Sequence, residues 1–557
     1  MALSIPRGAT VNAPSAERLR TCALGGDGLW LLGAAAALLL MCALPYVLSA
    51  LYGPADLERI GTFWFMRDFS QYQAAMRERA ASSSWLIHDH FSAEPHTPAL
   101  MYPLYVAAGK LAALLHVSDL SVFAALEWLG RLGILGAVYA FAATFVRNRT
   151  QRRLAVLLTL GTLGLDTFAA LAHAGLDALG AHAIASVFPD AINPYLEVSS
   201  FGALLSAPHL MFGLALTLAC APLYLRAIST TRRWWDVALL GLTVLTLSLV
   251  HSFNTPVLAT VLVGHAALSG KRAWPAGIVA AVAAAPMALY SLLLYATDPF
   301  WSGTYSVQNL MPSPAPWLLP LDYGLVLLAA PLAWHNVKRW PTERRNFILL
   351  WIAAGLVWMY APVPYQRRFA FGVQPALAVL AAVGLVELQG WMAARSFARW
   401  RMRLVNYAVV VAALSTSVLV YLALLASAVS DKPAEVYLWT HAEAAAGQWI
   451  STHSSSADVV LASTELANPL AGIIDGRVVH GHIVATLHTD AKSAQVHEFF
   501  SSSASIEERS RILAETGATM VAFGPRERAL GATDLSTQPG LTEVYDADGV
   551  EVYRVVP

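Results

Sequence analysis

Residues 28–51 read GLWLLGAAAALLLMCALPYVLSAL and contain no charged side chain. A helix needs about 20 mostly apolar residues to cross the hydrocarbon layer of a bilayer, and this stretch exceeds that length. It follows a polar tail of some 27 residues, and other apolar stretches come after it. We therefore interpret it as a retained first transmembrane span and not as a cleaved signal peptide.

Further apolar stretches of similar length follow the first one. They are roughly 122–146, 153–171, 203–226, 235–252, 255–270, 274–296, 317–334, 347–361, 369–388 and 405–428. The sequence thus predicts a polytopic α-helical membrane protein with about 11 spans. The segment 99–116 is also apolar, but it contains Pro103, Gly109 and Lys110, so we expect a helix that lies at the membrane interface.

The composition of the whole chain agrees with this interpretation. Only 13% of its 557 residues are charged and 57% are hydrophobic, whereas soluble domains average about 25% charged residues. Such a low charge content excludes a soluble multidomain enzyme, a disordered chain and a coiled coil. Lys and Arg total 36, as do Asp and Glu, and no long basic run is present, so nucleic acid is not an expected partner. The three cysteines, Cys22, Cys42 and Cys220, are too scattered for a disulfide framework or a metal cluster.

The positions of Lys and Arg predict the orientation of the spans. With the N-terminal tail, residues 1–27, in the cytoplasm, the inside connections carry 20 Lys and Arg residues, and the outside segments before the final tail carry seven. An odd number of spans then places the C-terminus on the extracytoplasmic side of the cytoplasmic membrane. Three long segments share that side: loops 52–98 and 172–202 of the transmembrane core 28–428, and the tail 429–557. Long loops gathered on one side often carry function.

The outside tail 429–557 alternates stretches typical of helices and of strands. Helices are expected over 442–452, 491–502 and 506–515, strands over 458–462, 476–482 and 518–525, and a closing hairpin over 542–556. This order predicts a small extracytoplasmic α/β domain with a mainly parallel sheet. It has no Gly-x-Gly-x-x-Gly or phosphate loop, so no nucleotide site is expected. The domain could bind the acceptor or simply cap the membrane core, and the residues to examine, for which turn and packing roles are the simpler interpretation, are His480, Gly481, His482, Thr486 and Arg526.

The first outside loop holds the most informative polar residues. Residues 61–97 read GTFWFMRDFSQYQAAMRERAASSSWLIHDHFSAEPHT, and 68–81 has helical spacing with Phe69, Tyr72 and Met76 on one stripe. We expect an amphipathic helix that lies along the membrane surface. Asp68 at its start could simply cap this helix, because a carboxylate suits a helix N-terminus.

The residues that follow Asp68 give it a second interpretation. They are Tyr72, then Pro103-Leu-Tyr105, then His116-Val-Ser-Asp-Leu120, and Arg131 in the second span. This order resembles the start of bacterial C-type (GT-C fold) polyprenyl-phosphate-dependent glycosyltransferases of the protein-mannosyltransferase-like kind. The pattern covers about residues 30–155, and one proline of the family's proline pair is missing. The resemblance implies that Asp68 is the catalytic base, which takes the proton of an acceptor hydroxyl as the oxygen attacks the anomeric carbon.

Tyr365, Arg367 and Arg368 lie in a short outside loop that breaks the positive-inside pattern. Two arginines at a helix start could snorkel to lipid headgroups. The guanidinium fork also matches phosphate oxygens, so we favour a clamp for the lipid phosphate over snorkelling. The leaving phosphate of a sugar transfer needs fixed positive charge or a metal.

Other polar residues at the outer membrane level complete the predicted substrate cavity. They are Tyr72, His88, Asp89, His90, Glu94, His96, Glu197, His209 and His251. The His, Asp and Glu side chains of the first loop would suit zinc or manganese, but their spacing matches no known signature, so a divalent cation is left open and the metal is unknown. Glu127 and Arg131, four residues apart, are expected to pair with each other.

We therefore predict an integral-membrane, inverting glycosyltransferase. It would move a sugar from a polyprenyl-phosphate donor to an extracytoplasmic glycan, lipid or protein. Two alternatives stay open. A transporter or flippase of lipid-linked glycans would show inverted repeats and broken helices near the midplane, and the sequence has no corresponding halves. A non-catalytic membrane scaffold with an outside binding domain would need neither Asp68 nor the paired arginines.

Overall fold

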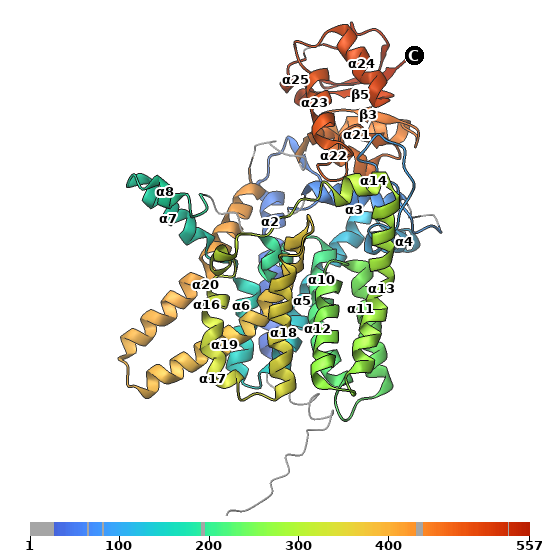
Figure 1. Cartoon of the computed structure of the whole chain (residues 1–557). Coiled ribbons are helices and arrows are strands. Elements are labelled where there is room, and N and C mark those ends of the chain that lie inside the picture. Colours follow the sequence, from blue (N-terminus) through green and yellow to red (C-terminus); the bar gives the residue numbers. More distant parts are fainter. Residues whose placement is uncertain are drawn as a thin grey trace, which may run out of the picture.

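A computed structural model describes residues 27–63, 66–78, 80, 83–190, 195–430, 438–532 and 534–556. The predicted cytoplasmic tail, apart from Asp27, and Cys22 with it lie outside these residues. A bundle of long helices forms one part of the molecule, and a small domain of strands and short helices forms the other (Figure 1). Cys42 and Cys220 are both buried in the bundle as free thiols.

Helices occupy every stretch that the sequence predicts to cross the membrane. Six of them are long and apolar enough to span: α2 (Gly28–Tyr52), α5 (Asp119–Phe145), α10 (Pro208–Ala227), α13 (Trp274–Thr297), η5 (Gln366–Ala370) together with α19 (Val373–Ala394), and α20 (Arg399–Ala428). Three others are shorter: α11 (Trp234–Val250), α12 (Asn254–Ser269) and α18 (Thr342–Trp358). The polytopic helical fold is confirmed, whereas the count of eleven spans is not.

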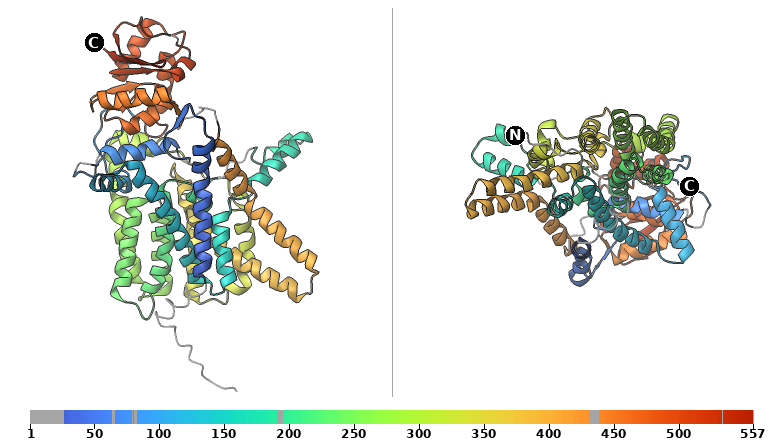
Figure 2. Two further views of the ribbon diagram at one scale, coloured as in Figure 1. Left: turned by 180° about the vertical axis from the view of Figure 1, so that it is seen from behind. Right: turned by 90° about the horizontal axis from the view of Figure 1, so that it is seen from below.

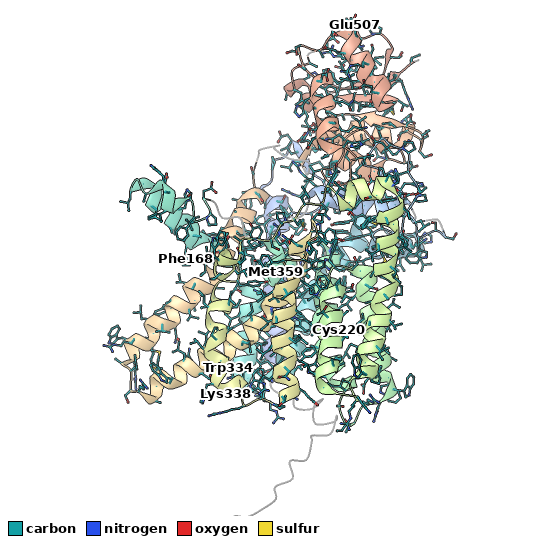
Figure 3. All side chains as sticks on the ribbon, in the orientation of Figure 1. Phe168, Cys220, Trp334, Lys338, Met359 and Glu507 are labelled. Carbon is teal, nitrogen blue, oxygen red and sulfur yellow. The ribbon has the colours of Figure 1, made fainter. Side chains whose placement is uncertain are left out.

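Two of the predicted spans are broken helices, and their breaks pack on each other. One is α6 (Arg149–Gly161) with α7 (Asp166–Ala178), bent by 54°, and the other is η3–α15 (Pro316–Asp322) with α16–α17 (Leu325–Val337), bent by 97°. Gly164 and Gly324 have positive φ at the breaks, and the Leu165 N–H donates to the Leu321 carbonyl at 2.8 Å. Phe168, just after the first break, lies near the end of the bundle that carries the small domain and not at its middle (Figure 3).

The two ends of the bundle differ in charge. The small domain covers one end, and the short connections between α10 and α11 and between α12 and α13 lie at the other (Figure 2). Lys338 lies at that second end (Figure 3). There Asp27 forms ion pairs with Arg152 and Arg153 of α6, the latter at 2.7 Å, which fasten the start of α2 to the bundle. The orientation in the membrane stays a prediction.

The C-terminal domain is built on a five-stranded sheet in the order β4-β3-β5-β7-β6. Its strands are β3 (Val459–Leu461), β4 (Arg477–Val478), β5 (Met520–Phe523), β6 (Leu541–Ala547) and β7 (Val550–Val555). The expected strands and hairpin are present, but the prediction of a mainly parallel sheet is wrong. The β4–β3 and β3–β5 pairings are parallel, whereas the β5–β7 and β7–β6 pairings are antiparallel. The helices are α21 (His441–His453), α22 (Thr464–Ile473), α23 (Thr489–Phe499), α24 (Ile506–Thr516) and α25 (Pro525–Ala529), of which α22 is not predicted from the sequence.

The first outside loop joins the bundle to the C-terminal domain. Its strand β1 (Leu57–Arg59) pairs antiparallel with β2 (Leu438–Thr440), and Ser92 bridges to His480. Helix α3 (Met66–Glu78) lies across the end of the bundle, as a surface helix would (Figure 1). It is covered, however, on one side by α4 (Pro103–Leu115) and on the other by α22. The apolar stripe Phe69, Tyr72 and Met76 is therefore buried in protein and does not face lipid.

Candidate active site

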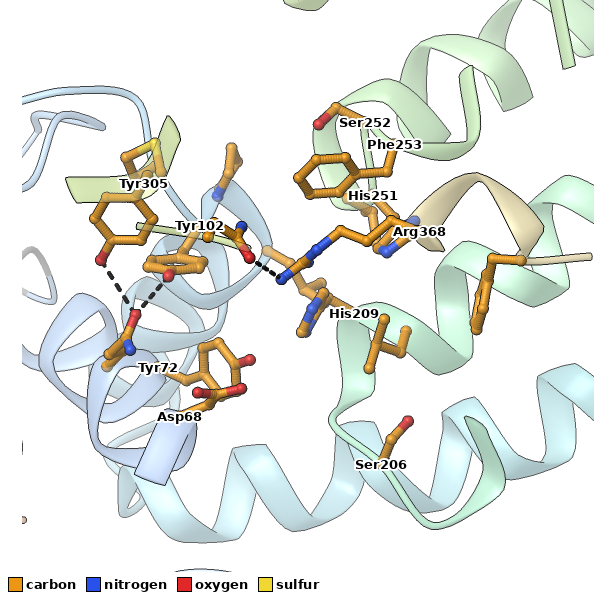
Figure 4. Close-up of a pocket in the computed structure, with 18 of the residues that line it drawn as sticks. Asp68, Tyr72, Tyr102, Ser206, His209, His251, Ser252, Phe253, Tyr305 and Arg368 are labelled. Carbon is orange, nitrogen blue, oxygen red and sulfur yellow. Dashed lines mark hydrogen bonds between the residues drawn. The ribbon is translucent and has the colours of Figure 1, made fainter. Parts of the chain in front are cut away.

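A cavity of about 450 Å³ lies between the end of the bundle and the C-terminal domain (Figure 4). Helices α3, α4, α10, the end of α11 and η5 line it, together with Val484 of the C-terminal domain. Of the residues that the sequence predicts in the site, seven line this cavity: Asp68, Tyr72, Glu197, His209, His251, Arg367 and Arg368. Another part of the wall is apolar and is formed by Leu104, Leu210, Leu249, Val250 and Met287.

Asp68 stands in the first turn of α3, where the helix dipole favours a carboxylate. Its side chain keeps 34% of its surface exposed, and its Oδ1 accepts a hydrogen bond from His482 Nε2 at 2.9 Å. Within the described part of the chain, no backbone N–H donates to this carboxylate, so the simple capping role is not what holds it. Asp68 is therefore a carboxylate with one partner and free access to the cavity.

Arg367 and Arg368 enter the cavity from η5, but their partners differ. The guanidinium of Arg367 forms an ion pair with Glu197 of η1 (Leu196–Val198) at 3.1 Å and lies 4.6 Å from the ring centre of Tyr195. The predicted cavity residue Glu197 therefore already neutralises one of the two arginines.

Arg368 donates from Nη2 to the neutral Asn309 amide oxygen at 3.2 Å and lies 4.6 Å from the ring centre of Phe253. No carboxylate among the described residues lies within ion-pair distance of it, and its buried Nε has no partner there. Arg368 thus brings to the cavity wall a positive charge that no described carboxylate compensates.

Aromatic side chains connect Asp68 to the arginines (Figure 4). The Tyr72 ring stacks on Tyr105 at 4.3 Å, and the Tyr102 hydroxyl donates to Gln71 Oε1 at 2.6 Å. The Tyr305 hydroxyl lies 3.1 Å from both Gln71 Oε1 and Asp89 Oδ2, which share its single proton. Burial holds the pKa values of these phenols above their usual range, so they stay neutral donors at physiological pH. Sequence reasoning named Tyr105 only as part of a motif and missed Tyr102 and Tyr305, which no local signal distinguishes from packing aromatics.

His209 and His251 lie deeper, beside Arg368 (Figure 4). His209 Nδ1 is 2.9 Å from the Tyr105 hydroxyl, and the two imidazole rings are 5.8 Å apart. His251 Nδ1 is buried without a partner among the described atoms. Farther from the cavity, Glu127 and Arg131 pair at 3.5 Å, as the sequence predicts.

The remaining first-loop residues do not line the cavity, which corrects their predicted place. His88, Asp89, His90, Glu94 and His96 instead fasten the loop to its surroundings. His90 Nδ1 bonds the Gly476 carbonyl at 2.7 Å, Glu94 pairs with Lys492 at 2.9 Å, and the His96 ring stacks on Phe300 at 3.9 Å. Burial raises the pKa of Asp89 to about 6, and its carboxylate accepts from the Tyr305 hydroxyl at 3.1 Å. The loop turns these side chains toward its own fold and the domain.

Tyr365 also lies outside the cavity lining. Its ring packs edge-on against Phe253 at 5.2 Å and Phe369 at 6.2 Å. Its place in the fold is therefore to support η5, from which the two arginines project.

The donor set does not fit a resident metal ion. Within the described residues, no group of three His, Cys, Asp or Glu side chains is placed to hold one. Asp68 and His482 supply two ligands, whereas catalytic zinc sites use three protein ligands. We therefore derive no step through a metal.

No protein-family model matches this chain, and no curated protein matches its sequence. Solved structures do match its fold. The arabinofuranosyltransferase AftD from mycobacteria superposes with a TM-score of 0.58 at 14% identity, over 95% of this chain and 41% of AftD. The Archaeoglobus fulgidus oligosaccharyltransferase with a tethered acceptor peptide gives a TM-score of 0.52 at 12% identity, over 96% of this chain and 75% of that one. This chain has the GT-C fold.

The GT-C superpositions cover both the helical bundle and the C-terminal domain, and they confirm the fold expected from the first loop. The same oligosaccharyltransferase has been solved with a dolichol-phosphate and an inhibitory peptide, and that structure matches at a TM-score of 0.51, 12% identity, over 95% of this chain and 74% of that one. ArnT from Cupriavidus metallidurans bound to undecaprenyl phosphate gives 0.48 at 14% identity, over 95% of this chain and 98% of ArnT. The narrower resemblance to protein mannosyltransferases stays a prediction.

Proposed function

We propose that this GT-C protein is a glycosyltransferase that takes its sugar from a polyprenyl-phosphate carrier and works on the extracytoplasmic face of the membrane. One observation carries the proposal. A single cavity holds an accessible carboxylate, Asp68, and a guanidinium without a carboxylate partner, Arg368 (Figure 4). These are the two charges that a sugar transfer from a lipid phosphate needs, one for the incoming hydroxyl and one for the leaving group.

Asp68 is the proposed general base. The acceptor oxygen forms a bond to the anomeric carbon, the bond from that carbon to the phosphate oxygen breaks, and the proton of the hydroxyl passes to the carboxylate. The phosphate leaves with the electron pair of the broken bond. One base opposite one leaving group is the arrangement of a single displacement, which inverts the anomeric centre.

Arg368 is the proposed partner of the leaving phosphate. Its positive charge, which no described carboxylate compensates, would stabilise the charge that develops on the phosphate oxygens. Glu197 already neutralises Arg367, so Arg367 would contribute less to binding the phosphate and would mainly order η5 beside Arg368. The apolar wall of Leu104, Leu249, Val250 and Met287 would suit the first units of the prenyl chain.

The division of the chain into a tail 1–27, a membrane core 28–428 and an outside domain 429–557 belongs to the same proposal. The long loop 52–98 and the C-terminal domain meet over the cavity, so both would lie on the side where the acceptor arrives. The sugar and the acceptor are left to experiment.

The test is sugar transfer by the purified protein from a panel of radiolabelled polyprenyl-phosphate sugars to total membrane acceptors. We expect the wild-type chain to release free polyprenyl phosphate and D68N to lose this release, while D56N, an exposed carboxylate of the same loop, keeps it. Full transfer by D68N would refute the role of the base. Movement of intact lipid-linked sugar across vesicles without bond cleavage would favour the transporter alternative and refute the enzyme.

A further inference from the structure

The carboxylate of Asp68 has a partner from the far end of the sequence. His482 belongs to the turn between β4 and α23 of the C-terminal domain, 414 residues away, and its Nε2 lies 2.9 Å from Asp68 Oδ1. The His482 side chain is 3% exposed, whereas that of Asp68 is 34% exposed. Asp68 lines the cavity and His482 does not, so the imidazole stands behind the carboxylate and not beside the substrate.

The second ring nitrogen of His482 fixes the proton position. Its Nδ1 lies 3.2 Å from the Val484 backbone nitrogen, which can only donate. Nδ1 is therefore the acceptor of the neutral ring, and the ring proton sits on Nε2 and points at Asp68.

The turn that holds His482 is itself tied down. Thr486 Oγ1 accepts hydrogen bonds from the backbone N–H groups of Gly481 and His482, at 3.1 and 3.0 Å, and donates to the Phe91 carbonyl at 2.6 Å. The imidazole also packs edge-on against the Phe91 ring at 6.2 Å. The side chain therefore has little freedom to leave the carboxylate.

Asn468 of α22 couples the two partners through their neighbours. It is 1% exposed, and its amide nitrogen donates to the Arg67 carbonyl at 3.1 Å and to the Gly481 carbonyl at 2.8 Å. These are the residues that directly precede Asp68 and His482 in the chain. Its amide oxygen accepts from Ser70 Oγ at 3.1 Å. One buried side chain thus holds the start of α3 and the His482 turn at a fixed separation.

We infer that His482 is a positioning residue of the active site, supplied by the C-terminal domain, which orients Asp68 and keeps its second oxygen free for the acceptor hydroxyl. The inference rests on the proposed role of Asp68. It makes the C-terminal domain part of the catalytic machinery. The hydrogen bond from Nε2 engages one carboxylate oxygen and so limits rotation of the Asp68 side chain.

The experiment compares kcat and KM for the lipid-linked sugar in four variants. H482A removes the N–H group that donates to Asp68. We expect kcat to fall on the order of 100-fold with little change in KM, because a misplaced base still permits the lipid-linked sugar to bind. H482Q, whose amide can reach the Nε2 position, should recover much of kcat.

R77Q is the matched control, because Arg77 also joins α3 to the C-terminal domain, donating to the Gly472 carbonyl at 3.3 Å, but does not contact Asp68. An H482A protein with the kcat of R77Q would overturn the inference. If H482A does not fold, H482Q decides alone: a loss of kcat as large as the one expected of H482A would overturn it. D68N separates the two hypotheses, because an active D68N refutes the proposed function, whereas an inactive D68N with an unaffected H482A refutes only the positioning role.

Discussion

Replacing Arg368 by Gln tests the electrostatics of the cavity most directly. In the wild-type chain, the guanidinium makes one neutral hydrogen bond to Asn309 at 3.2 Å and, among the described residues, no ion pair. A lipid phosphate could therefore accept from two N–H groups of Arg368 at no cost to an existing ion pair. Each charged hydrogen bond contributes about 1.5–3 kcal/mol. We expect R368Q to lose about 3 kcal/mol of transition-state stabilisation, which is roughly 150-fold in kcat/KM.

The neighbouring arginine provides the contrast. Arg367 pairs with Glu197, and each side chain is 18% exposed. R367Q leaves the Glu197 carboxylate without its cation, and breaking a buried pair in this way destabilises a protein by about 3–5 kcal/mol, less where water reaches it. R367Q should therefore lower the melting temperature more than R368Q does. The double variant E197Q/R367Q should restore most of the stability.

The assay measures release of polyprenyl phosphate under steady-state conditions, with the melting temperature of each variant in detergent beside it. R368K keeps the charge but loses the planar fork, so an intermediate loss of about tenfold is expected. The reasoning would be refuted if R368Q kept wild-type kcat/KM, or if R367Q impaired transfer strongly while its melting temperature stayed unchanged.

Two further predictions concern stability. G109A should lower both the melting temperature and transfer, because an added Cβ would lie 2.0 Å from the Met76 carbonyl oxygen and push α4 away from α3; G136A, which meets nothing within 4 Å, is the matched control and should leave both unchanged. Burial lowers the pKa of His480 to about 4, so the folded state favours the neutral imidazole. The contribution of this group to the free energy of unfolding is therefore complete above about pH 6.5 and is lost as the pH falls toward 4. That loss amounts to about 2 kcal/mol at pH 5, and H480N should therefore show a smaller drop in melting temperature between pH 7.5 and 5 than the wild type; parallel drops would contradict the burial argument.

The positions of the helices follow from the sequence because the bilayer imposes a length and an apolar composition on every span. The breaks at Gly164 and Gly324 are not predicted from the sequence, since a single aspartate beside each glycine, Asp166 and Asp322, is all the charge in an otherwise mostly apolar stretch. The mixed sheet of the C-terminal domain was missed for a similar reason. The closing hairpin was expected over 542–556, but its pairing beside β5 depends on contacts between distant strands.

The sequence by itself determined the membrane class, the helix positions and the candidate residues Asp68, Arg367 and Arg368, because hydropathy, charge placement and motif order are local properties. Only the tertiary structure decided which charges are available. It paired Arg367 with Glu197, left Arg368 without a carboxylate partner, and placed His482 behind Asp68. Those outcomes depend on segments separated by 170 and 414 residues, whose approach is set by the packing of α3 against α22 and of η5 against η1. Distances of this kind are fixed by the core as a whole, and no stretch of the chain encodes them alone.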